Sequence, residues 1–267
     1  MKMIHMSVPG HPEATLEGYI LDCELSLGLE TNRPAIVVCP GGGYRFRSPR
    51  EAEPVALVFA AMGFNCFVVE YHVAPAVHPA ALADLAHAVA WVRAHAEECH
   101  ANPDAIAVMG FSAGGHAACH IGVRWHDAAQ MAEFGLTPEQ AKPNAMVLCY
   151  PVITAGKYAH RGSFEHLTAS TDLAVHAQYS LEEQVTEQTP PTFLWHTWED
   201  GSVPCENSLF FACAMRRCGV KGEVHIFPKG GHGIGLANPL TSDSPDQNIP
   251  ECAQWPEMAA RFLKQVM

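Results

Sequence analysis

The most informative segment of this 267-residue chain is Ile106-Ala107-Val108-Met109-Gly110-Phe111-Ser112-Ala113-Gly114-Gly115-His116 (IAVMGFSAGGH). It combines an apolar run of strand length, a G-x-S-x-G pattern over Gly110–Gly114, and a following run that can be helical. A tight strand-to-helix turn crowds the residues two before and two after the serine, so both must be small. The turn lifts the hydroxyl above the sheet edge and points the next helix's N-terminus toward developing negative charge. The stretch therefore predicts that Ser112 is a nucleophile.

Apolar runs and helical patterns alternate on both sides of this motif. Continuous apolar runs are typical of strands covered on both faces, as in a parallel sheet. The predicted strands are five such runs and one alternating run: Ala35–Cys39, Cys66–Val69, Ile106–Met109, Met146–Tyr150, Thr192–Trp195 and Val224–Phe227. The predicted helices run from Pro54 to Gly63, from about Pro79, over Pro204–Cys218 and from about Pro256. This order predicts an α/β fold with a mostly parallel central sheet, helices on both faces and right-handed crossovers.

No repeat or low-complexity linker divides the chain, so we expect residues 1–267 to form one domain. The segment Val152–Thr189 breaks the alternation, because its periodicity is weak and it is rich in His, Ser and Thr. A segment of this length between two strands is expected to be a lid or a substrate-selecting insertion. The sequence leaves open whether it moves.

Composition narrows the function classes. The chain is 48% hydrophobic and 16% charged, with a net charge of -12, so a nucleic-acid or anionic-membrane partner is not expected. No signal peptide or membrane span is visible, which favours a cytoplasmic protein, although a secreted mature form would read the same. The ten cysteines include no C-x-x-C pair and lie mostly in apolar runs, which favours buried thiols. A homo-oligomer is left open.

A serine nucleophile needs a base. In α/β folds whose serine lies in a G-x-S-x-G turn, the catalytic residues follow the chain order Ser, then Asp or Glu, then His. Asp200 follows the strand Thr192–Trp195, and His232 lies in Gly230-Gly231-His232-Gly233 after another strand. Both occupy loops at carboxyl ends of strands, where ligands bind in open parallel sheets. We predict that His232 is the base and Asp200 its acidic partner, with Glu199 as the alternative acid.

Other features of the sequence concern an oxyanion hole and possible metal ligands. Cys39-Pro40-Gly41-Gly42-Gly43-Tyr44 follows the first confident strand, and its glycine N–H groups, with that of Ala113, are expected to form an oxyanion hole. His116 and His120 have the spacing of two zinc ligands on one helix face, but the intervening residues include no glutamate and the helix should be buried. No metal or cofactor is expected. Asp84 is expected to be a structural hydrogen-bond partner.

An ordered set of motifs resembles the bacterial α/β-hydrolase esterases related to acetyl xylan esterases and the hormone-sensitive-lipase-like group. The set covers the chain from about Arg33 onward: Pro40–Tyr44, Ser48–Pro54, Glu70–Pro75, Gly110–His116, His196-Thr197 with Asp200 and Val203-Pro204, His225–Pro228 and Gly231–Gly233. The resemblance implies an α/β-hydrolase fold with residues 152–189 inserted after its sixth strand.

The resemblance also implies site residues and substrates. It implies a Ser112–Asp200–His232 triad, oxyanion donors at Gly42, Gly43 and Ala113, and Tyr44 at the pocket edge. The implied substrates are small acyl esters, such as O-acetyl groups on plant-polysaccharide sugars or xylooligosaccharides. Pro40 stands where lipase-like relatives have histidine, which fits the carbohydrate-esterase branch better. A peptidase or formamidase with the same triad, or a catalytically silent binding module, remains an alternative.

Overall fold

Eight strands form one sheet in the order β1-β2-β4-β3-β5-β6-β7-β8 in the computed structural model, which describes residues 1–23 and 32–267. The strands are β1 Lys2–Val8, β2 His11–Ile20, β3 Arg33–Cys39, β4 Asn65–Glu70, β5 Ala101–Phe111, β6 Ala145–Cys149, β7 Thr192–Thr197 and β8 Gly222–Phe227. From β4 across to β8 every pairing is parallel, whereas β1 pairs antiparallel with β2 and β2 antiparallel with β4. The sheet is thus mostly parallel with an antiparallel hairpin at one end, and the predicted α/β-hydrolase fold is confirmed.

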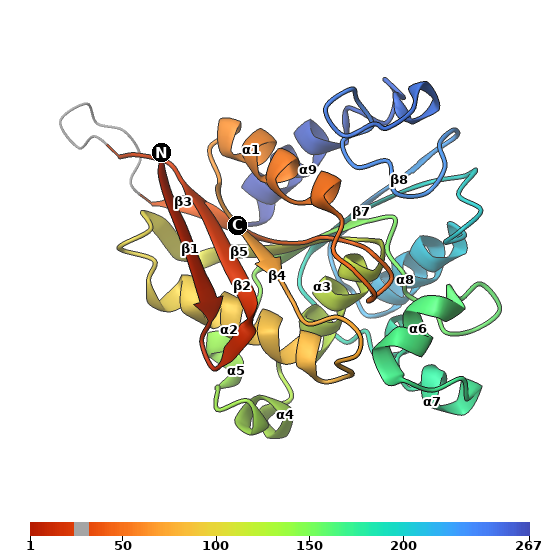
Figure 1. The fold of residues 1–267 in the computed structure, drawn as a ribbon, viewed down its shortest axis with the longest axis horizontal. Helices are drawn as coiled ribbons and strands as arrows, with labels where there is room; N and C mark the ends of the chain where they lie inside the picture. The colour runs from red at the N-terminus through yellow and green to blue at the C-terminus, as the bar shows by residue number, and fades with distance from the viewer. Residues whose placement is uncertain (24–31) are drawn as a thin grey trace.

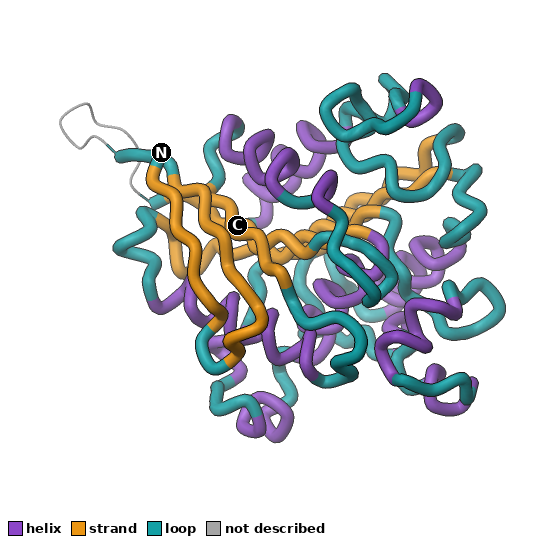
Figure 2. Tube along the Cα trace, in the orientation of Figure 1, coloured by secondary structure: helices purple, strands orange, loops and turns teal. Residues whose placement is uncertain are grey.

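Helices cover both faces of this sheet (Figures 1 and 2). They are α1 Glu53–Ala61, α2 Ala80–Ala94, α3 Ser112–Arg124, α4 Ala128–Glu133, α5 Pro138–Ala141, α6 Arg161–Thr168, α7 Leu173–Ala177, α8 Glu206–Arg217 and α9 Trp255–Val266, with short 3-10 turns at Pro49–Glu51, Leu181–Glu183 and Pro245–Gln247. Helices α1 and α9 pack on one face, and α2, α3 and α8 pack on the other. No helix among the described residues is long and apolar enough to cross a membrane.

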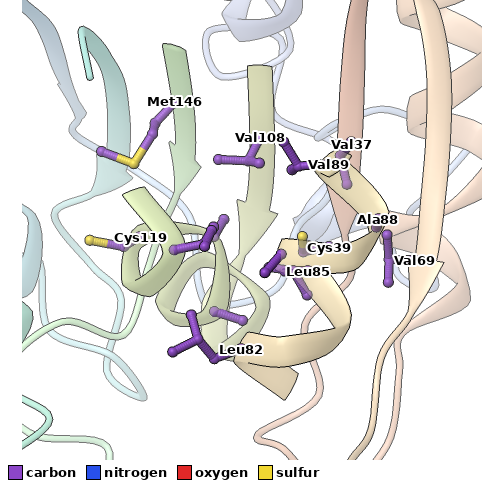
Figure 3. Packing of buried hydrophobic residues seen from close by; sticks show 14 of the residues in the cluster. Val37, Cys39, Val69, Leu82, Leu85, Ala88, Val89, Val108, Cys119 and Met146 are labelled. Carbon is purple, nitrogen blue, oxygen red and sulfur yellow. The ribbon is translucent and has the colours of Figure 1, made fainter. Parts of the chain in front are cut away.

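The core forms because the parallel strands are apolar along their whole length. Val37 and Cys39 on β3 and Val108 on β5 are fully buried. They pack in one cluster with Leu85 and Val89 of α2 (Figure 3). Alternate residues of the same strands face α1 and α9, so both sheet faces are buried at once. The helix predicted from about Pro79 therefore faces the core through Leu82, Leu85, Val89 and Val92. Cys39, Cys66, Cys119 and Cys149 are buried thiols without disulfides, as predicted.

The hairpin of β1 and β2 was not predicted from the sequence. In β1 every residue except Val8 is exposed or half-buried, and β2 becomes mostly buried only from Ala14 onward. Strand β1 carries exposed polar side chains along an edge of the sheet. The segment Val152–Thr189, in whose sequence the periodicity is weak, holds the two short helices α6 and α7, which were not predicted. These helices lie side by side beyond the carboxyl end of β6 (Figure 1). Short amphipathic elements give little periodic signal, which explains why both were missed.

Candidate active site

Ser112 lies at the sharp turn where β5 ends and α3 begins. Its φ is 53°, in the left-handed region that non-glycine residues rarely adopt. A Cβ on Gly110 would lie 2.1 Å from the carbonyl oxygen of Gly114, and a Cβ on Gly114 would lie 2.2 Å from that of Cys39. The two glycines of the G-x-S-x-G pattern are therefore required by close backbone contacts, as the sequence predicted.

Three side chains from distant parts of the chain form one hydrogen-bonded line. His232 Nε2 lies 2.7 Å from Ser112 Oγ, and His232 Nδ1 lies 2.7 Å from Asp200 Oδ2. An ionised carboxylate only accepts hydrogen bonds, so Nδ1 carries the proton and Nε2 is left to accept from the serine hydroxyl. This arrangement has the geometry of a nucleophile, a base and an orienting acid.

Asp200 is held by several donors in a buried position. Its Oδ1 accepts hydrogen bonds from the backbone N–H groups of Ser202 and Val203, and its Oδ2 lies 3.2 Å from His196 Nε2. Burial opposes ionisation, but the hydrogen bonds from His196 and His232 outweigh it and lower the pKa of Asp200 below its ordinary value. The carboxylate therefore stays charged beside the imidazole.

In the described residues the alternative acid, Glu199, contacts the backbone of Gly230 and not His232. Its side chain is exposed, and its Oε2 accepts a hydrogen bond of 3.3 Å from the backbone N–H of Gly230. No interaction between Glu199 and His232 occurs in the part of the chain described. Of the two acids that the sequence left open, the structure brings only Asp200 to the histidine.

The glycine loop after β3 lies beside Ser112 in an open conformation. Gly42 has φ 131°, and a Cβ there would lie 2.0 Å from the carbonyl oxygen of Phe46, so only glycine fits. Within residues 1–23 and 32–267, the N–H groups of Gly42 and Gly43 donate to no protein acceptor. Ala113 is in the first turn of α3, where N–H groups lack helical partners. Three backbone donors are thus available next to the serine.

Glu51 was not predicted from the sequence to be a functional residue, but it is hydrogen-bonded to this glycine loop. It is 2% exposed, its Oε2 accepts from the N–H of Gly41 at 2.8 Å, and its Oε1 accepts from the Tyr150 hydroxyl at 2.7 Å. The Tyr150 hydroxyl in turn accepts from the N–H of Gly235 at 2.9 Å. Burial raises the pKa of Glu51, and the bonds from Tyr150 and Gly41 oppose that rise. The pair links the glycine loop to the loop that carries His232.

The Tyr150 ring adds a direct contact to the base. It packs edge-on against the His232 imidazole, with ring centroids 5.2 Å apart. Arg50, the residue before Glu51, donates to the carbonyl oxygen of Gly233 at 3.3 Å and to Asp243 Oδ2 at 2.6 Å. The loop of His232 is therefore held from two sides by residues of the Ser48–Pro54 motif and by Tyr150.

A cleft of about 510 Å³ opens above Ser112. It is lined by both loops, by the turn after Asp200 and by α6: Gly42, Gly43, Arg45, Phe46, Ser48, Arg50, Glu51, Ser112, His160, Gly162, His166, Ser202, His232, Gly233 and Gln247. His166 Nδ1 lies 2.9 Å from the carbonyl oxygen of Gly43, and burial lowers the pKa of His160. The segment 152–189 thus forms one wall of the cleft.

Tyr44 is not where the resemblance implied. It is 3% exposed, its hydroxyl bonds His116 Nδ1 at 2.8 Å, and it does not line the cleft. The positive φ of 57° at Tyr44 turns its side chain into the core, and Arg45 and Phe46 line the cleft instead. The placement of Tyr44 at the pocket edge is therefore corrected.

The histidines on α3 are committed to packing. His116 Nε2 lies 3.0 Å from the carbonyl oxygen of Tyr179, and burial lowers the pKa of His116 to about 4. The ring of His120 stacks on that of His78. Among the described residues, one other group has metal-ligand spacing: His11, His72 and Asp84, outside the cleft.

The chain matches one family model and several known proteins. The BD-FAE family model matches residues 21–215. The chain is 35% identical over 218 residues to endo-1,4-beta-xylanase B of Butyrivibrio fibrisolvens and 30% identical over 228 residues to an acetylxylan esterase of Xylanibacter ruminicola. These matches cover 78% and 83% of this chain but only 34% and 45% of the two relatives, so the chain spans less than half of either.

A solved structure matches over nearly its whole length. The acetyl ester-xyloside bifunctional hydrolase of Caldicellulosiruptor lactoaceticus superposes with a TM-score of 0.83 at 35% identity, covering 98% of this chain and 96% of that one. The fold and the Ser–His–Asp geometry define the class of serine hydrolases with the α/β-hydrolase fold. Within that class, this chain belongs to the BD-FAE family.

Proposed function

We propose that this chain is a serine carboxylesterase that removes small acyl groups, chiefly acetyl, from xylan-derived or other plant-polysaccharide oligosaccharides. One observation carries the proposal. An unbroken hydrogen-bonded line runs from Ser112 Oγ through His232 to Asp200, next to a loop whose Gly42 and Gly43 N–H groups donate to no protein acceptor in the described residues. Such a combination suits acyl transfer from an ester.

The first half-reaction acylates the serine. Ser112 Oγ bonds to the ester carbonyl carbon while His232 Nε2 takes its proton, and the carbonyl electron pair moves onto oxygen. The N–H groups of Gly42, Gly43 and Ala113 stabilise that oxyanion, and each such donor is typically worth about 3–4 kcal/mol of barrier. As the intermediate collapses, the carbon–oxygen bond to the alcohol breaks and His232 protonates the departing oxygen.

The second half-reaction releases the acid. Water loses a proton to His232 Nε2 and adds to the acyl carbon, and the resulting intermediate collapses to the carboxylic acid as Ser112 regains its proton from His232. Asp200 stabilises the imidazolium in both steps through the 2.7 Å contact to Nδ1. The reaction needs no cofactor.

The proposed substrate class rests on the relatives and on the cleft. Two relatives are named for acetylxylan esterase and acetyl ester-xyloside hydrolase activity. The cleft wall offers the polar side chains of Arg50, His160, His166 and Gln247, which can bond the hydroxyl groups of a sugar. Deacetylation of short xylooligosaccharides fits both observations.

The test is acetate release from acetylated xylooligosaccharides by the wild-type protein, Ser112→Ala and the matched control Ser7→Ala on β1. We expect Ser112→Ala to lose at least about 10⁴-fold in kcat and to escape labelling by a fluorophosphonate, while Ser7→Ala behaves as wild type. Acetate release that survives in Ser112→Ala would overturn the proposal. Parallel assays with p-nitrophenyl acetate, longer acyl esters and an aminoacyl anilide separate an esterase from a peptidase or formamidase.

A further inference from the structure

Three metal-ligating side chains converge from separate elements on the hairpin side of the molecule. His11 begins β2, His72 follows β4, and Asp84 lies on α2. Their candidate ligand atoms all lie within 4.8 Å of one another. His11 Nδ1 lies 2.8 Å from Asp84 Oδ1, and His72 Nδ1 lies 2.8 Å from Asp84 Oδ2. None of the three lines the Ser112 cleft.

Asp84 is the unusual member of this group because it is completely buried. Its Oδ2 accepts a hydrogen bond of 2.6 Å from the backbone N–H of His72, but its Oδ1 has no hydrogen-bond donor in the described part of the chain. His11 Nδ1 is near enough to Oδ1 but is not aligned to donate a proton to it. A buried carboxylate oxygen without a donor is costly, so a bound cation would stabilise it.

The neighbouring groups are those that a metal ion uses. The ion pairs of Asp84 in the described residues are with the two histidines, with no Lys or Arg among them. The second nitrogen of His72, Nε2, lies 3.6 Å from Glu13 Oε2. Metal-bound imidazoles commonly donate their other N–H to a carboxylate, and Glu13, an exposed side chain just beyond hydrogen-bond distance, is the carboxylate nearest to this nitrogen among the ion pairs of the described residues.

The donor set selects the kind of ion. Two imidazole nitrogens and one carboxylate suit Zn²⁺ and other first-row transition ions better than Mg²⁺ or Ca²⁺, which prefer oxygen ligands. A tetrahedral Zn²⁺ separates its ligand atoms by about 3.3 Å, which lies between the 2.8 Å contacts of Asp84 and the 4.8 Å within which all the candidate ligand atoms fall. His11 and His72 retain about a fifth of their side-chain exposure, 21% and 19%, which leaves a path for the ion and a water.

We propose that His11, His72 and Asp84 form a Zn²⁺ site with water as the fourth ligand. The ion joins the start of β2 to the end of β4 and to α2, so it stabilises the attachment of the antiparallel hairpin to the parallel sheet. The proposal is independent of the esterase function, because none of these residues lines the cleft or contacts Ser112, His232 or Asp200.

The test uses protein stripped of metal with a chelator, then given ZnCl₂ in excess over the protein. The variants are His11→Gln and His72→Gln, and the control is His5→Gln, an exposed histidine on β1 that also faces a carboxylate, Glu17, at 3.2 Å. At free Zn²⁺ about a hundredfold above Kd, we expect Tm to rise by about 5 °C in the wild type and in His5→Gln. We expect no rise in the other two variants and an unchanged kcat throughout.

Metal content and Co²⁺ spectra complete the experiment. Elemental analysis after dialysis should find one zinc per wild-type chain, and Co²⁺ should give the d–d absorption of a nitrogen–oxygen site without the charge-transfer band of thiolate ligands. A zinc-induced rise in Tm that is equal in His11→Gln and the wild type refutes the site, as does a cobalt spectrum with thiolate bands. Because His11 lies at the partly exposed hairpin and Asp84 stays in place, His11→Gln keeps the test valid even if an Asp84 variant does not fold.

Discussion

Replacing Tyr150 by phenylalanine tests the link between the two active-site loops. The substitution removes one oxygen and keeps the ring that packs against His232. It breaks two bonds, the 2.7 Å bond that the hydroxyl donates to Glu51 and the 2.9 Å bond that it accepts from the N–H of Gly235. Tyr150 is 1% exposed, so water cannot replace the lost oxygen without rearrangement.

The cost in stability follows from these two bonds. Each buried group left without a partner costs about 1–3 kcal/mol. The lower end applies to Glu51, because losing the bond from Tyr150 raises the pKa of Glu51 further and so favours the neutral carboxyl, which costs less to bury than the charged one. We expect a loss of about 3 kcal/mol in the free energy of unfolding, or about 5 °C in Tm for a chain of this size.

The pH dependence has a definite sign. A carboxyl whose pKa is higher in the folded than in the unfolded state binds more protons when folded, so its contribution to stability falls as pH rises. The deficit of Tyr150→Phe relative to the wild type should therefore grow between about pH 5 and pH 8. Urea unfolding at both pH values measures it.

The effect on catalysis should exceed the effect on binding. Without the hydroxyl, the Glu51 side and the Gly235 side of the cleft lose this link, and the bonds of Arg50 to Gly233 and Asp243 remain. A misplacement of reacting groups by about 1 Å can cost about 10²-fold in rate. We expect kcat on p-nitrophenyl acetate to fall 10- to 100-fold with little change in KM. Tyr19→Phe is the control, because it removes a buried tyrosine hydroxyl on β2, far along the sheet.

If Tyr150→Phe loses stability as expected but keeps kcat within twofold of the wild type, the hydroxyl does not position the loops. If Tyr19→Phe loses as much kcat as Tyr150→Phe, the effect is general destabilisation. Either result would refute the reasoning.

Further predictions concern the acid, the serine turn and the loop support. Asp200→Asn should lower kcat by about 10³- to 10⁴-fold, whereas Glu199→Gln should change it less than threefold; esterase assays compare the two. The lowered pKa of Asp200 means that its stabilising contribution is present above about pH 4 and is lost as pH falls further. The free energy of unfolding, measured with urea, should therefore fall less on acidification in Asp200→Asn than in the wild type. Gly110→Ala should prevent soluble expression or lower Tm by more than 10 °C, since its Cβ meets the Gly114 oxygen at 2.1 Å. Glu51→Gln should retain more kcat than Glu51→Ala, because an amide can still accept from the loop; equal losses would contradict this.

Much of the fold could be predicted from the sequence because the parallel strands are buried on both faces and are therefore continuous apolar runs. Apolar runs at Ala35–Cys39 and Ile106–Met109 fall within β3 and β5, which are buried along those stretches. The hairpin was missed because β1 is a half-exposed edge strand, and its pairing with β2 is set by the neighbouring β4. Edge strands give a weak apolar signal, so their presence depends on the sheet that they join.

The serine turn and the place of His232 could be predicted from local sequence, because the small residues at Gly110 and Gly114 and the position of His232 after a strand are local properties of the chain. The choice between Asp200 and Glu199 depends on the tertiary structure, in which Asp200 contacts His232 and Glu199 contacts the backbone of Gly230, since adjacent residues in one turn point in different directions. Distant pairs were likewise beyond local patterns. Glu51 and Tyr150 are 99 positions apart, and His11 reaches Asp84 only across the hairpin. Such contacts depend on the order of strands in the sheet, which fixes the neighbours of each loop and is not encoded in any short stretch.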